Sequence, residues 1–388
     1  MSKLDELIQK LCPNGVEYKT IKETVGLNRG SRLVKNQLSD DFEYEVYHGS
    51  KDTILGKYDN FNAPANTTIV VNTGGIGGVK FIDKPFWCSD GSFWLGHCES
   101  INDKFLYYCL AGYEEYFASK KRVGGVPTID RDVVESFKIP VPPMEVQCEI
   151  VHILDQFTLL TAELTAELTA RRKQYQYYLD ALFEQSNGIE KKLDEIGTFT
   201  RGKRFVHADA VSEDGIPCVH YGELYTYYGV IANKSKSQIR KSILEEKTLR
   251  YANKGDVIIV GAGENDEDIG IGVAWDGDYK VAVHDACYTF VSEQNPKFIS
   301  YYLRSSSYHK QIKPYVSRGK ICAISSQGIG KAIIKVPSLE EQGRIVSILE
   351  NFDTYCNDLT QGLPAEIELR KQQYEYYRDK LLSFKELK

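Results

Sequence analysis

Apolar residues recur in a strict four-three alternation along one long stretch of the chain. Between residues 150 and 182, eight of the ten positions in this series are apolar: they read Ile, Leu, Phe, Thr, Leu, Leu, Arg, Tyr, Tyr and Leu. This spacing is typical of a coiled-coil seam, whereas a helix that packs on a globular core shows a wider apolar stripe. The pattern predicts one long helix that follows the prolines at 140, 142 and 143.

A second copy of this seam lies near the C-terminus. Four residues of the first half, beginning with Gln147, recur unchanged 195 positions later, and three tyrosines of the second half recur 199 positions later. The second copy has therefore gained four residues, which fall around Gly362–Pro364. Such an insertion is a stutter in a heptad pattern, and a proline at this place can also break the helix.

Two matched seams in one chain predict an intramolecular antiparallel coiled coil. The second seam also runs through Leu359, near the extra residues. The seam residues on which this prediction depends are Ile150, Leu154, Phe157, Leu164, Leu168, Tyr175, Tyr178, Ile345, Leu349, Phe352, Tyr374 and Tyr377.

The segment before each long helix has a mixed pattern and is a divergent copy of the other. Short apolar runs such as Thr67–Asn72 and Val257–Gly261 alternate with glycine turns, which predicts strands beside a few helices. An Arg-Gly pair and a later arginine recur 172 residues apart, and the letters VYHGS at 46–50 resemble VHYGE at 219–223.

We therefore expect two α/β (α+β) globules and two long helices in a pseudo-twofold circular arrangement. The circular element comes from the chain ends, because LSFKELK followed by MSKLDELIQKL resembles the link at 181–197. The expected segments are a first globule at 1–143, a first long helix at 144–187, a second globule at 188–338 and a second long helix at 339–388.

Composition indicates a soluble protein of more than one domain. The 388 residues suffice for two cores, and no apolar run approaches the length that spans a bilayer. The N-terminus reads as a short amphipathic helix with acidic residues, not as a signal peptide. Nine cysteines without any C-x-x-C spacing indicate reduced thiols, so we expect a cytoplasmic protein.

No catalytic constellation survives inspection, so no catalytic residue, metal site or bound cofactor is expected. The run Gly197–Lys203 resembles a phosphate loop, but Arg204 stands where Ser or Thr must bind magnesium. The glycine-rich turns at 74–78 and 261–263 lack the dinucleotide-binding spacing. His97, Cys98 and Cys88 lack a fourth metal ligand and are better explained as structural residues.

Positive charge gathers at matching places in the two globules, although the net charge is −6. Most of these cations stand in glycine-punctuated loops beside aromatic residues, a composition suited to phosphate neutralisation and base contact. A single cluster of this kind is usually a solvated loop, but its recurrence in both copies favours a DNA-binding surface. The candidate DNA-binding residues are Arg29, Arg32, Lys120, Lys121, Arg122, Arg201, Lys203, Arg204, Tyr221, Tyr225, Arg318 and Lys320.

The order of these parts resembles the specificity subunit of type I restriction–modification systems. Three stretches carry the resemblance: TAELTAELTARRKQYQYY at 161–178, LRKQQYEYY at 369–377 and VHYGELYTYYG at 219–229. The resemblance implies that each globule recognises one half of a split target in double-stranded DNA. It also implies that the helix pair spaces the globules and docks two methyltransferase subunits, with the seam residues above serving both roles.

The resemblance assigns the chemistry to partner subunits. S-adenosylmethionine would bind the methyltransferase subunits, which methylate adenine N6, and ATP and Mg would act on motor-nuclease subunits. Two other interpretations stay open from the residues alone. One is a two-globule coiled-coil scaffold that binds no DNA, and the other is a self-contained restriction or methylation enzyme, for which no cofactor motif is present.

Overall fold

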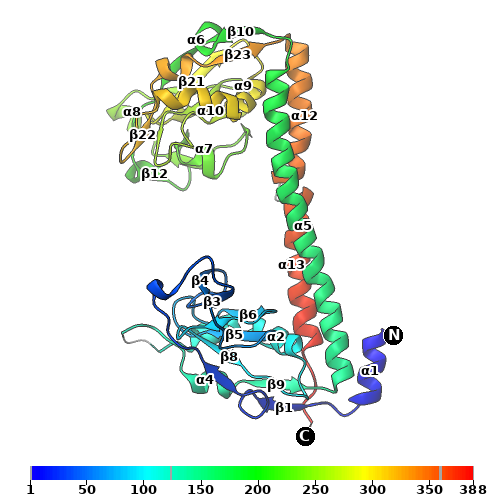
Figure 1. Ribbon diagram of the computed structural model, residues 1–388. Coiled ribbons are helices and arrows are strands. Elements are labelled where there is room, and N and C mark those ends of the chain that lie inside the picture. The colour runs from blue at the N-terminus through cyan, green and yellow to red at the C-terminus, as the bar shows by residue number, and fades with distance from the viewer. Residues whose placement is uncertain (1, 123–124, 358–360, 388) are drawn as a thin grey trace. The chain divides into compact units, whose positions relative to one another are not determined.

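A computed structural model of the chain describes residues 2–122, 125–357 and 361–387. The chain divides into two compact units, Met1–Thr165 with Glu366–Lys388 and Ala166–Ala365. Each unit contains one globule of helices and sheets together with the parts of the long helices that pack on it (Figure 1). The mixed α/β class is confirmed, while the division at 143, 187 and 338 stays a prediction.

The globule of the first unit is built from short elements, and their order in the chain is as follows. They are α1 (Lys3–Leu11), β1 (Glu17–Thr20), β2 (Leu27–Arg29), η1 (Lys35–Gln37), β3 (Tyr44–Tyr47), β4 (Ile54–Tyr58), β5 (Thr67–Val71), β6 (Val79–Ile82), β7 (Trp87–Cys88), β8 (Ser92–Leu95), α2 (Asp103–Ala111), α3 (Glu114–Ser119), α4 (Arg131–Glu135) and β9 (Lys138–Val141).

The globule of the second unit repeats this order with additional short strands and helices. Its elements are β10 (Ile189–Lys192), α6 (Leu193–Ile196), β11 (Gly197–Arg201), η2 (His207–Asp209), β12 (Ala210–Val211), β13 (Ile216–Val219), α7 (Glu223–Thr226), β14 (Ile231–Ala232), β15 (Ser237–Ile239), α8 (Ile243–Glu246), β16 (Tyr251–Ala252), β17 (Val257–Val260), β18 (Ala262–Gly263), β19 (Gly272–Trp275), β20 (Val281–Val283), β21 (Cys287–Ser292), α9 (Pro296–Tyr302), α10 (Ser306–Ile312), η3 (Lys313–Tyr315), β22 (Cys322–Ala323), α11 (Ser326–Gly330) and β23 (Ile333–Val336).

The sheets of the two globules correspond strand by strand. The order β2-β8-β5-β6 in the first globule matches β11-β21-β17-β19 in the second, where β14 adds a fifth strand. A second sheet is built around the parallel pair β3–β7 in the first globule and around the parallel pair β13–β20 in the second. The terminal pairs β1–β9 and β10–β23 close each globule beside its long helix. The duplication in the sequence is therefore a duplication of the fold.

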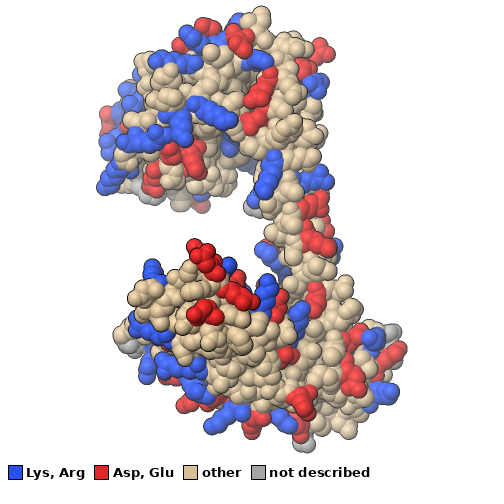
Figure 2. Space-filling model, viewed as in Figure 1, with Lys and Arg blue, Asp and Glu red and all other residues tan. Residues whose placement is uncertain are grey.

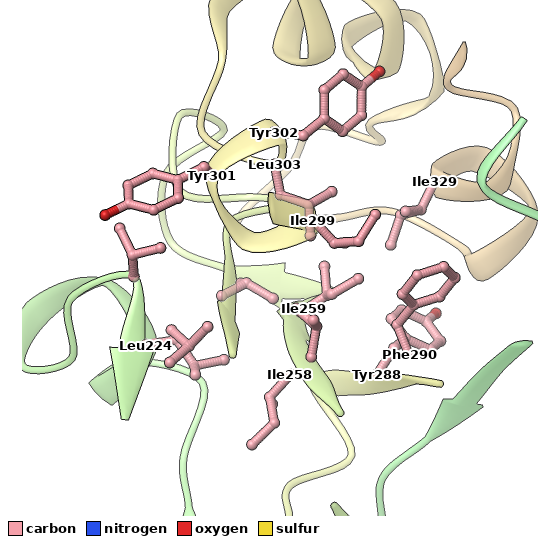
Figure 3. Close-up of a cluster of buried hydrophobic side chains, with 14 of the residues drawn as sticks. Leu224, Ile258, Ile259, Tyr288, Phe290, Ile299, Tyr301, Tyr302, Leu303 and Ile329 are labelled. Carbon is pink, nitrogen blue, oxygen red and sulfur yellow. The ribbon is translucent and has the colours of Figure 1, made fainter. Parts of the chain in front are cut away.

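The core of the second globule fixes the short helices that carry its loops. All four residues of β17 are buried, as expected for an apolar run covered on both faces. Ile299 and Leu303 from the α9 segment lie on the side of this strand that Ile259 faces, and Ile258 points to the other side (Figure 3). Leu224 of α7 belongs to the same buried cluster, so the helix that follows Tyr221 is held by the core.

A buried glutamine fastens the start of each long helix to its globule. Helix α5 is Met144–Glu184, and in its first turn Gln147 accepts the Asn102 backbone N–H at 2.8 Å and donates to the Ser100 and Pro142 carbonyls at 2.8 and 2.7 Å. In the second unit, Gln342 accepts the Asn295 N–H at 2.9 Å and donates to the Pro337 carbonyl at 2.9 Å. Both glutamines are fully buried.

The Asn residues held by these glutamines are themselves helix caps. The Asn102 side chain accepts the N–H groups of Lys104 and Phe105 at the start of α2, and Asn295 does the same for Lys297 and Phe298 at the start of α9. Such side chains replace hydrogen-bond partners that the first turn of a helix lacks. One glutamine in each unit thus joins the long helix, the cap and the globular helix.

The C-terminal region forms two helices, which corrects the expectation of one long helix over 339–388. Helix α12 is Leu339–Asn357 and α13 is Gly362–Leu381, and Leu359 lies outside the described residues. Gly362 has φ +76, and a Cβ there would lie 2.6 Å from the Tyr355 carbonyl oxygen. Only glycine tolerates both conditions. The helix is therefore interrupted where the sequence carries its four extra residues.

The antiparallel pairing of the helices is confirmed within each unit. In the first unit the rings of Phe157 and Tyr377 stack at 5.3 Å, and in the second unit Tyr178 and Phe352 stack at 5.4 Å. The outer parts of the seam are buried by the globules: Ile150 and Leu154 belong to the first core, and Ile345 and Leu349 to the second. Leu164 and Leu168 are half-buried, as are Tyr175 and Tyr374.

The two ends of the chain meet in the first unit. Val16 forms two backbone hydrogen bonds with the C-terminal segment. Its N–H donates to the Lys385 carbonyl, and its carbonyl accepts the Leu387 N–H, both at 2.9 Å. The Tyr18 hydroxyl also donates to the Phe384 carbonyl at 3.1 Å. In the second unit the chain runs continuously from α5 into β10 at the corresponding place. The circular arrangement is therefore confirmed.

We predict that Gln147→Ala destabilises the first unit by about 3 kcal/mol, because it leaves the buried Pro142 carbonyl and the partly buried Asn102 N–H and Ser100 carbonyl without this partner. Chemical denaturation followed by circular dichroism measures the change. Gln156 is exposed on the same helix and gives the matched control, for which we expect Gln156→Ala to change stability by less than about 0.5 kcal/mol. Equal effects of the two substitutions would contradict the proposed role of the clamp.

Candidate nucleic-acid interface

An Arg-Gly segment leaves the first strand of each main sheet in the same way. The Gly30 N–H donates to the Ser92 carbonyl at 3.3 Å, and the Gly202 N–H donates to the Cys287 carbonyl at 2.9 Å. A Cβ on Gly30 would lie 2.0 Å from the Ser89 carbonyl oxygen, and one on Gly202 would lie 2.2 Å from that of His284. Glycine is required at both positions because another backbone passes too closely for a side chain.

We call the place where the glycine passes the other backbone the crossing. The predicted cations on either side of this glycine are exposed. Arg29 ends β2 and Arg32 follows it, and both side chains are exposed. In the second globule Arg201 ends β11 and donates from Nε to the Asp285 carbonyl at 2.7 Å. Lys203 and Arg204 are exposed beyond it. The structure thus presents two to three cations beside each crossing.

A histidine lies next to the crossing in each globule, and the sequence analysis did not single it out. In the second globule the rings of His220 and His284 lie 5.2 Å apart, and both contact Phe205. The Ala286 N–H donates to Nδ1 of His284, so Nε2 carries the proton and donates to the Phe205 carbonyl at 3.0 Å. Burial of the imidazole lowers the pKa of His284, which agrees with this neutral form.

The histidines correct the alignment of the two globules. The letters VYHGS and VHYGE align Tyr47 with His220, but the strand register pairs Tyr47 with Cys88 and Val219 with Val283. The Tyr47 and Val219 carbonyls also accept equivalent N–H groups, those of Ser89 and His284. His48 therefore corresponds to His220, and it contacts the Ser89 hydroxyl at 3.2 Å. Letter matching failed here because the register is set by pairing with a distant strand.

Helix α7 places the two predicted tyrosines beside this cluster. Tyr221 lies against His284, with ring centroids 5.9 Å apart. The carboxylate of Glu223 is buried, accepts the His220 N–H at 3.0 Å and contacts the Ser237 hydroxyl, which anchors the helix. Tyr225 is half-buried, with its hydroxyl near Gly263 of β18. Burial raises the pKa of Tyr225, so this hydroxyl stays protonated at neutral pH.

The remaining predicted cations lie at a hairpin base that both globules share: Lys120 and Lys121 precede it in the first globule, whereas Arg318 and Lys320 follow it in the second. Arg122 and Thr128 form its base in the first globule, and the N–H of Arg122 donates to the Thr128 carbonyl at 2.8 Å. In the second globule the N–H of Ser317 donates to the Ala323 carbonyl at 2.9 Å, and Arg318 and Lys320 lie in the loop between these two residues. The two hairpins are separated by 195 positions, the same interval as the two long helices.

The hairpin is tied to the rest of the interface by short strand pairs. Thr73 forms a bridge with Thr128, and β18 pairs with β22 through Ala262 and Ala323. Lys120 lies over the Tyr116 ring at 5.3 Å, Lys121 is exposed, and Arg122 forms an exposed ion pair with Asp130 at 3.7 Å. In each globule the crossing, the histidine and the hairpin therefore form one connected surface, which we call the loop face.

Several other cations are engaged within the second globule and do not belong to the loop face. Arg240 pairs with Asp209 at 3.0 Å and with Glu246 at 2.6 Å, and Lys241 pairs with Asp214 at 2.5 Å. On the face drawn in Figure 2, Lys and Arg side chains cover much of the second globule around α8 and β22, with Asp and Glu side chains beside them. Clusters of positive charge in the sequence thus include both paired and exposed cations.

No metal-binding group of three or more His, Cys, Asp or Glu occurs in the part of the chain that the structure describes. Over the same residues, no helix combines the length and the apolar character that crossing a membrane requires. The candidate site described above is a surface of loops that presents cations, backbone amides and aromatic rings.

The fold is that of a known class of two-globule proteins. The crystal structure of a type I restriction–modification system S subunit from M. genitalium superimposes with a TM-score of 0.55 at 19% identity, covering 95% of this chain and 96% of that one. A chain from a structure concerned with complex assembly and conformational transition of the type I R-M system gives a TM-score of 0.65 at 15% identity, with coverage of 96% and 98%. Both likenesses concern the fold.

Sequence comparison gives the family. A sequence profile described as "Type I restriction modification DNA specificity domain" matches residues 13–171 and 187–369. The EcoR124I/EcoR124II specificity subunit of Escherichia coli is 35% identical over 72% of this chain and 70% of its own length. A Haemophilus influenzae protein named as a type I restriction enzyme specificity subunit is 29% identical over 95% and 96%. The chain belongs to the type I restriction–modification specificity subunit family.

We predict that Gly202→Ala disrupts the crossing, because its Cβ would overlap the His284 carbonyl. The substitution should change the histidine resonances of the His220–His284 pair in an NMR spectrum and lower the stability of the second unit by about 2 kcal/mol or more. Gly229→Ala is the matched control, since a Cβ there meets no atom within 4 Å. Unchanged histidine resonances in Gly202→Ala would contradict the assigned geometry.

Proposed function

We propose that this chain is the sequence-reading subunit of a type I restriction–modification complex, in which each globule reads one half of a bipartite DNA target. The observation that carries the proposal is the loop face, which recurs in both globules with the same backbone geometry and with exposed cations. Duplicated surfaces suit two half-sites on one duplex, as in symmetric dimers that bind DNA.

The target should be asymmetric because the two loop faces carry different side chains. The first has Arg29, Arg32 and the cations at 120–122, whereas the second has Arg201, Arg204 and the pair Arg318 and Lys320. Arg and Lys contact guanine edges as well as phosphates, so a different arrangement of these groups selects different bases. The aromatic Tyr221 and Tyr225 are present in the second globule alone at these positions.

The helix pair is proposed to dock two methyltransferase subunits, one on each unit. Equivalent aromatic side chains support this, because Tyr177 on α5 and Tyr376 on α13 are 66% and 61% exposed. Each lies beside a second tyrosine, Tyr178 or Tyr377, in an edge-to-face contact. Exposed aromatic residues are enriched in interface hot spots. S-adenosylmethionine, ATP and Mg would then act on partner subunits, including motor-nuclease subunits.

An electrophoretic mobility assay with the partner methyltransferase tests the proposal. We expect binding that weakens with salt and prefers one sequence, which methylome sequencing of a host expressing both proteins would identify. Absence of sequence preference would instead support a scaffold that does not read DNA. Methyl transfer by the purified chain alone would contradict the division of labour between subunits.

The tandem TAEL units at 161–164 and 165–168 give a second prediction. Each unit of four residues lengthens an α-helix by about 6 Å. Deleting or adding one unit should keep both half-sites and change the spacer between them by one or two base pairs, as read by methylation mapping. Altered half-sites with an unchanged spacer would refute this role of the helix.

Substitution of single cations should separate the two half-sites. We expect Arg32→Ala to weaken or relax recognition of the half read by the first globule and to leave the other half intact, because Arg32 belongs to the first unit only. Methylation mapping of the variant measures the base preference at each position. Lys371→Ala, on an exposed position of α13, serves as the control for the loss of one positive charge.

A further inference from the structure

An acidic insertion distinguishes the second loop face from the first. In both globules a turn follows the central strand, and the same hydrogen bonds enclose it: Gly77 donates to the Val71 carbonyl and Gly270 to that of Val260, both at 2.9 Å. Both glycines have φ +89. The enclosed residues are 72–76 in the first globule but 261–269 in the second, so the second turn has gained four residues.

The insertion replaces a neutral turn by a charged one. The first turn reads Asn-Thr-Gly-Gly-Ile, and the second reads Gly-Ala-Gly-Glu-Asn-Asp-Glu-Asp-Ile, which brings four carboxylates to the loop face. The side chains of Glu264, Asp266 and Glu267 are exposed. Carboxylates repel the phosphates of DNA, so their position on a surface that otherwise carries cations requires an explanation.

One of these carboxylates is paired with the predicted DNA-binding arginine. Arg318 donates from Nε to Oδ2 of Asp266 at 3.0 Å, and both side chains are about half exposed. The fold brings the two side chains together, because the acidic turn contains β18 and the hairpin with Arg318 contains β22, and these two strands pair. The Arg318 hydrogen bond lowers the pKa of Asp266, which stays ionised at neutral pH.

The geometry leaves one edge of the guanidinium available. Nε is taken by Asp266, and within the described ranges 2–122, 125–357 and 361–387 no other ion-pair partner of Arg318 is present. The two Nη groups form the fork that binds O6 and N7 of guanine in the major groove. The hairpin that carries Arg318 is closed by one antiparallel β-bridge, between Ser317 and Ala323.

A crevice lies beside the Arg318–Asp266 pair, and both residues line it. It has a volume of about 580 Å³, and Lys310, Lys313 and Glu267 also line it. Lys310 lies in α10 and Lys313 begins η3, the helical segments that precede the hairpin, and α3, the corresponding helix of the first globule, carries Glu114 and Glu115 instead. Cations for the DNA backbone are thus available next to Arg318 without using Arg318 itself.

We propose that Arg318 reads a guanine in the second half-site, and that Asp266 is its positioning residue. This inference rests on the proposed function and assigns a base contact to a residue that would otherwise be one of several cations. Asp266 holds the guanidinium by Nε with its fork outward. The carboxylate also disfavours a phosphate as the alternative partner of Arg318, so the insertion lowers non-specific binding and sharpens sequence preference.

The test uses the full chain assembled with its methyltransferase partner, the target found by methylome sequencing and a duplex without that target. Arg318→Lys keeps the charge but loses the fork. We expect affinity for the target to fall about 5- to 150-fold and one guanine position to become relaxed, with the affinity for the other duplex and its salt dependence unchanged. Asp266→Asn should raise affinity for the other duplex and lower the ratio between the two.

Two further variants separate positioning from charge. Asp266→Glu keeps a carboxylate that can reach Nε and should restore most of the base preference. Glu267→Gln removes the same charge one residue away, where no contact with Arg318 exists, and should raise non-specific binding without relaxing the guanine position. If the loop acts only through its charge, Glu267→Gln shows the same loss of base preference as Asp266→Asn, and that result would overturn the positioning role.

The outcome also distinguishes this inference from the proposed function. If Arg318→Ala weakens both duplexes equally and lowers the salt slope by about one, Arg318 contacts a phosphate and the inference is wrong, while DNA reading by the chain stands. If Arg318→Lys leaves every position of the target intact, the guanine assignment is wrong. If the unmodified complex shows no sequence preference, the proposed function fails and the inference fails with it.

Discussion

A single buried amide in each unit joins the long helix, the cap of a globular helix and the strand segment that ends in proline. The long helices carry narrow apolar seams, so they depend on the globules to bury their ends. Gln147 and Gln342 supply that attachment at the first turn, where they bind the cap of the neighbouring helix and the carbonyl of a preceding proline. A buried amide is costly unless its partners are in place, so it specifies one arrangement of helix and globule.

Lysine–carboxylate pairs reinforce this attachment about two turns further along each long helix. Lys104 pairs with Asp155 and Lys297 with Glu350, each at 2.7 Å. These pairs are partly exposed and contribute little to stability by themselves. Like the glutamines, they occupy equivalent positions in the two units. Towards the middle, the contact between helices passes to stacked rings, Phe157 with Tyr377 and Phe352 with Tyr178, and the burial of the seam decreases.

Periodicity predicted the helices and the duplication well, because those depend on local spacing. The break at Gly362 was also legible, since four extra residues and a proline mark it in the sequence. The loop face was harder. Its cations were found, but His48 and His220 were misaligned because their correspondence is set by strand register. The contact between Asp266 and Arg318 joins residues 52 apart, and no local pattern announces such a pair.

The turn between Val260 and Gly270 has a consequence for how new specificities arise. Two backbone hydrogen bonds and one glycine close this turn identically in the two globules, whether it holds five residues or nine. The fold therefore accepts different lengths and charges between the residues that close the turn. A gene can exchange, lengthen or recharge that segment in one step, and selection then acts on the DNA sequence that is read rather than on the ability of the chain to fold.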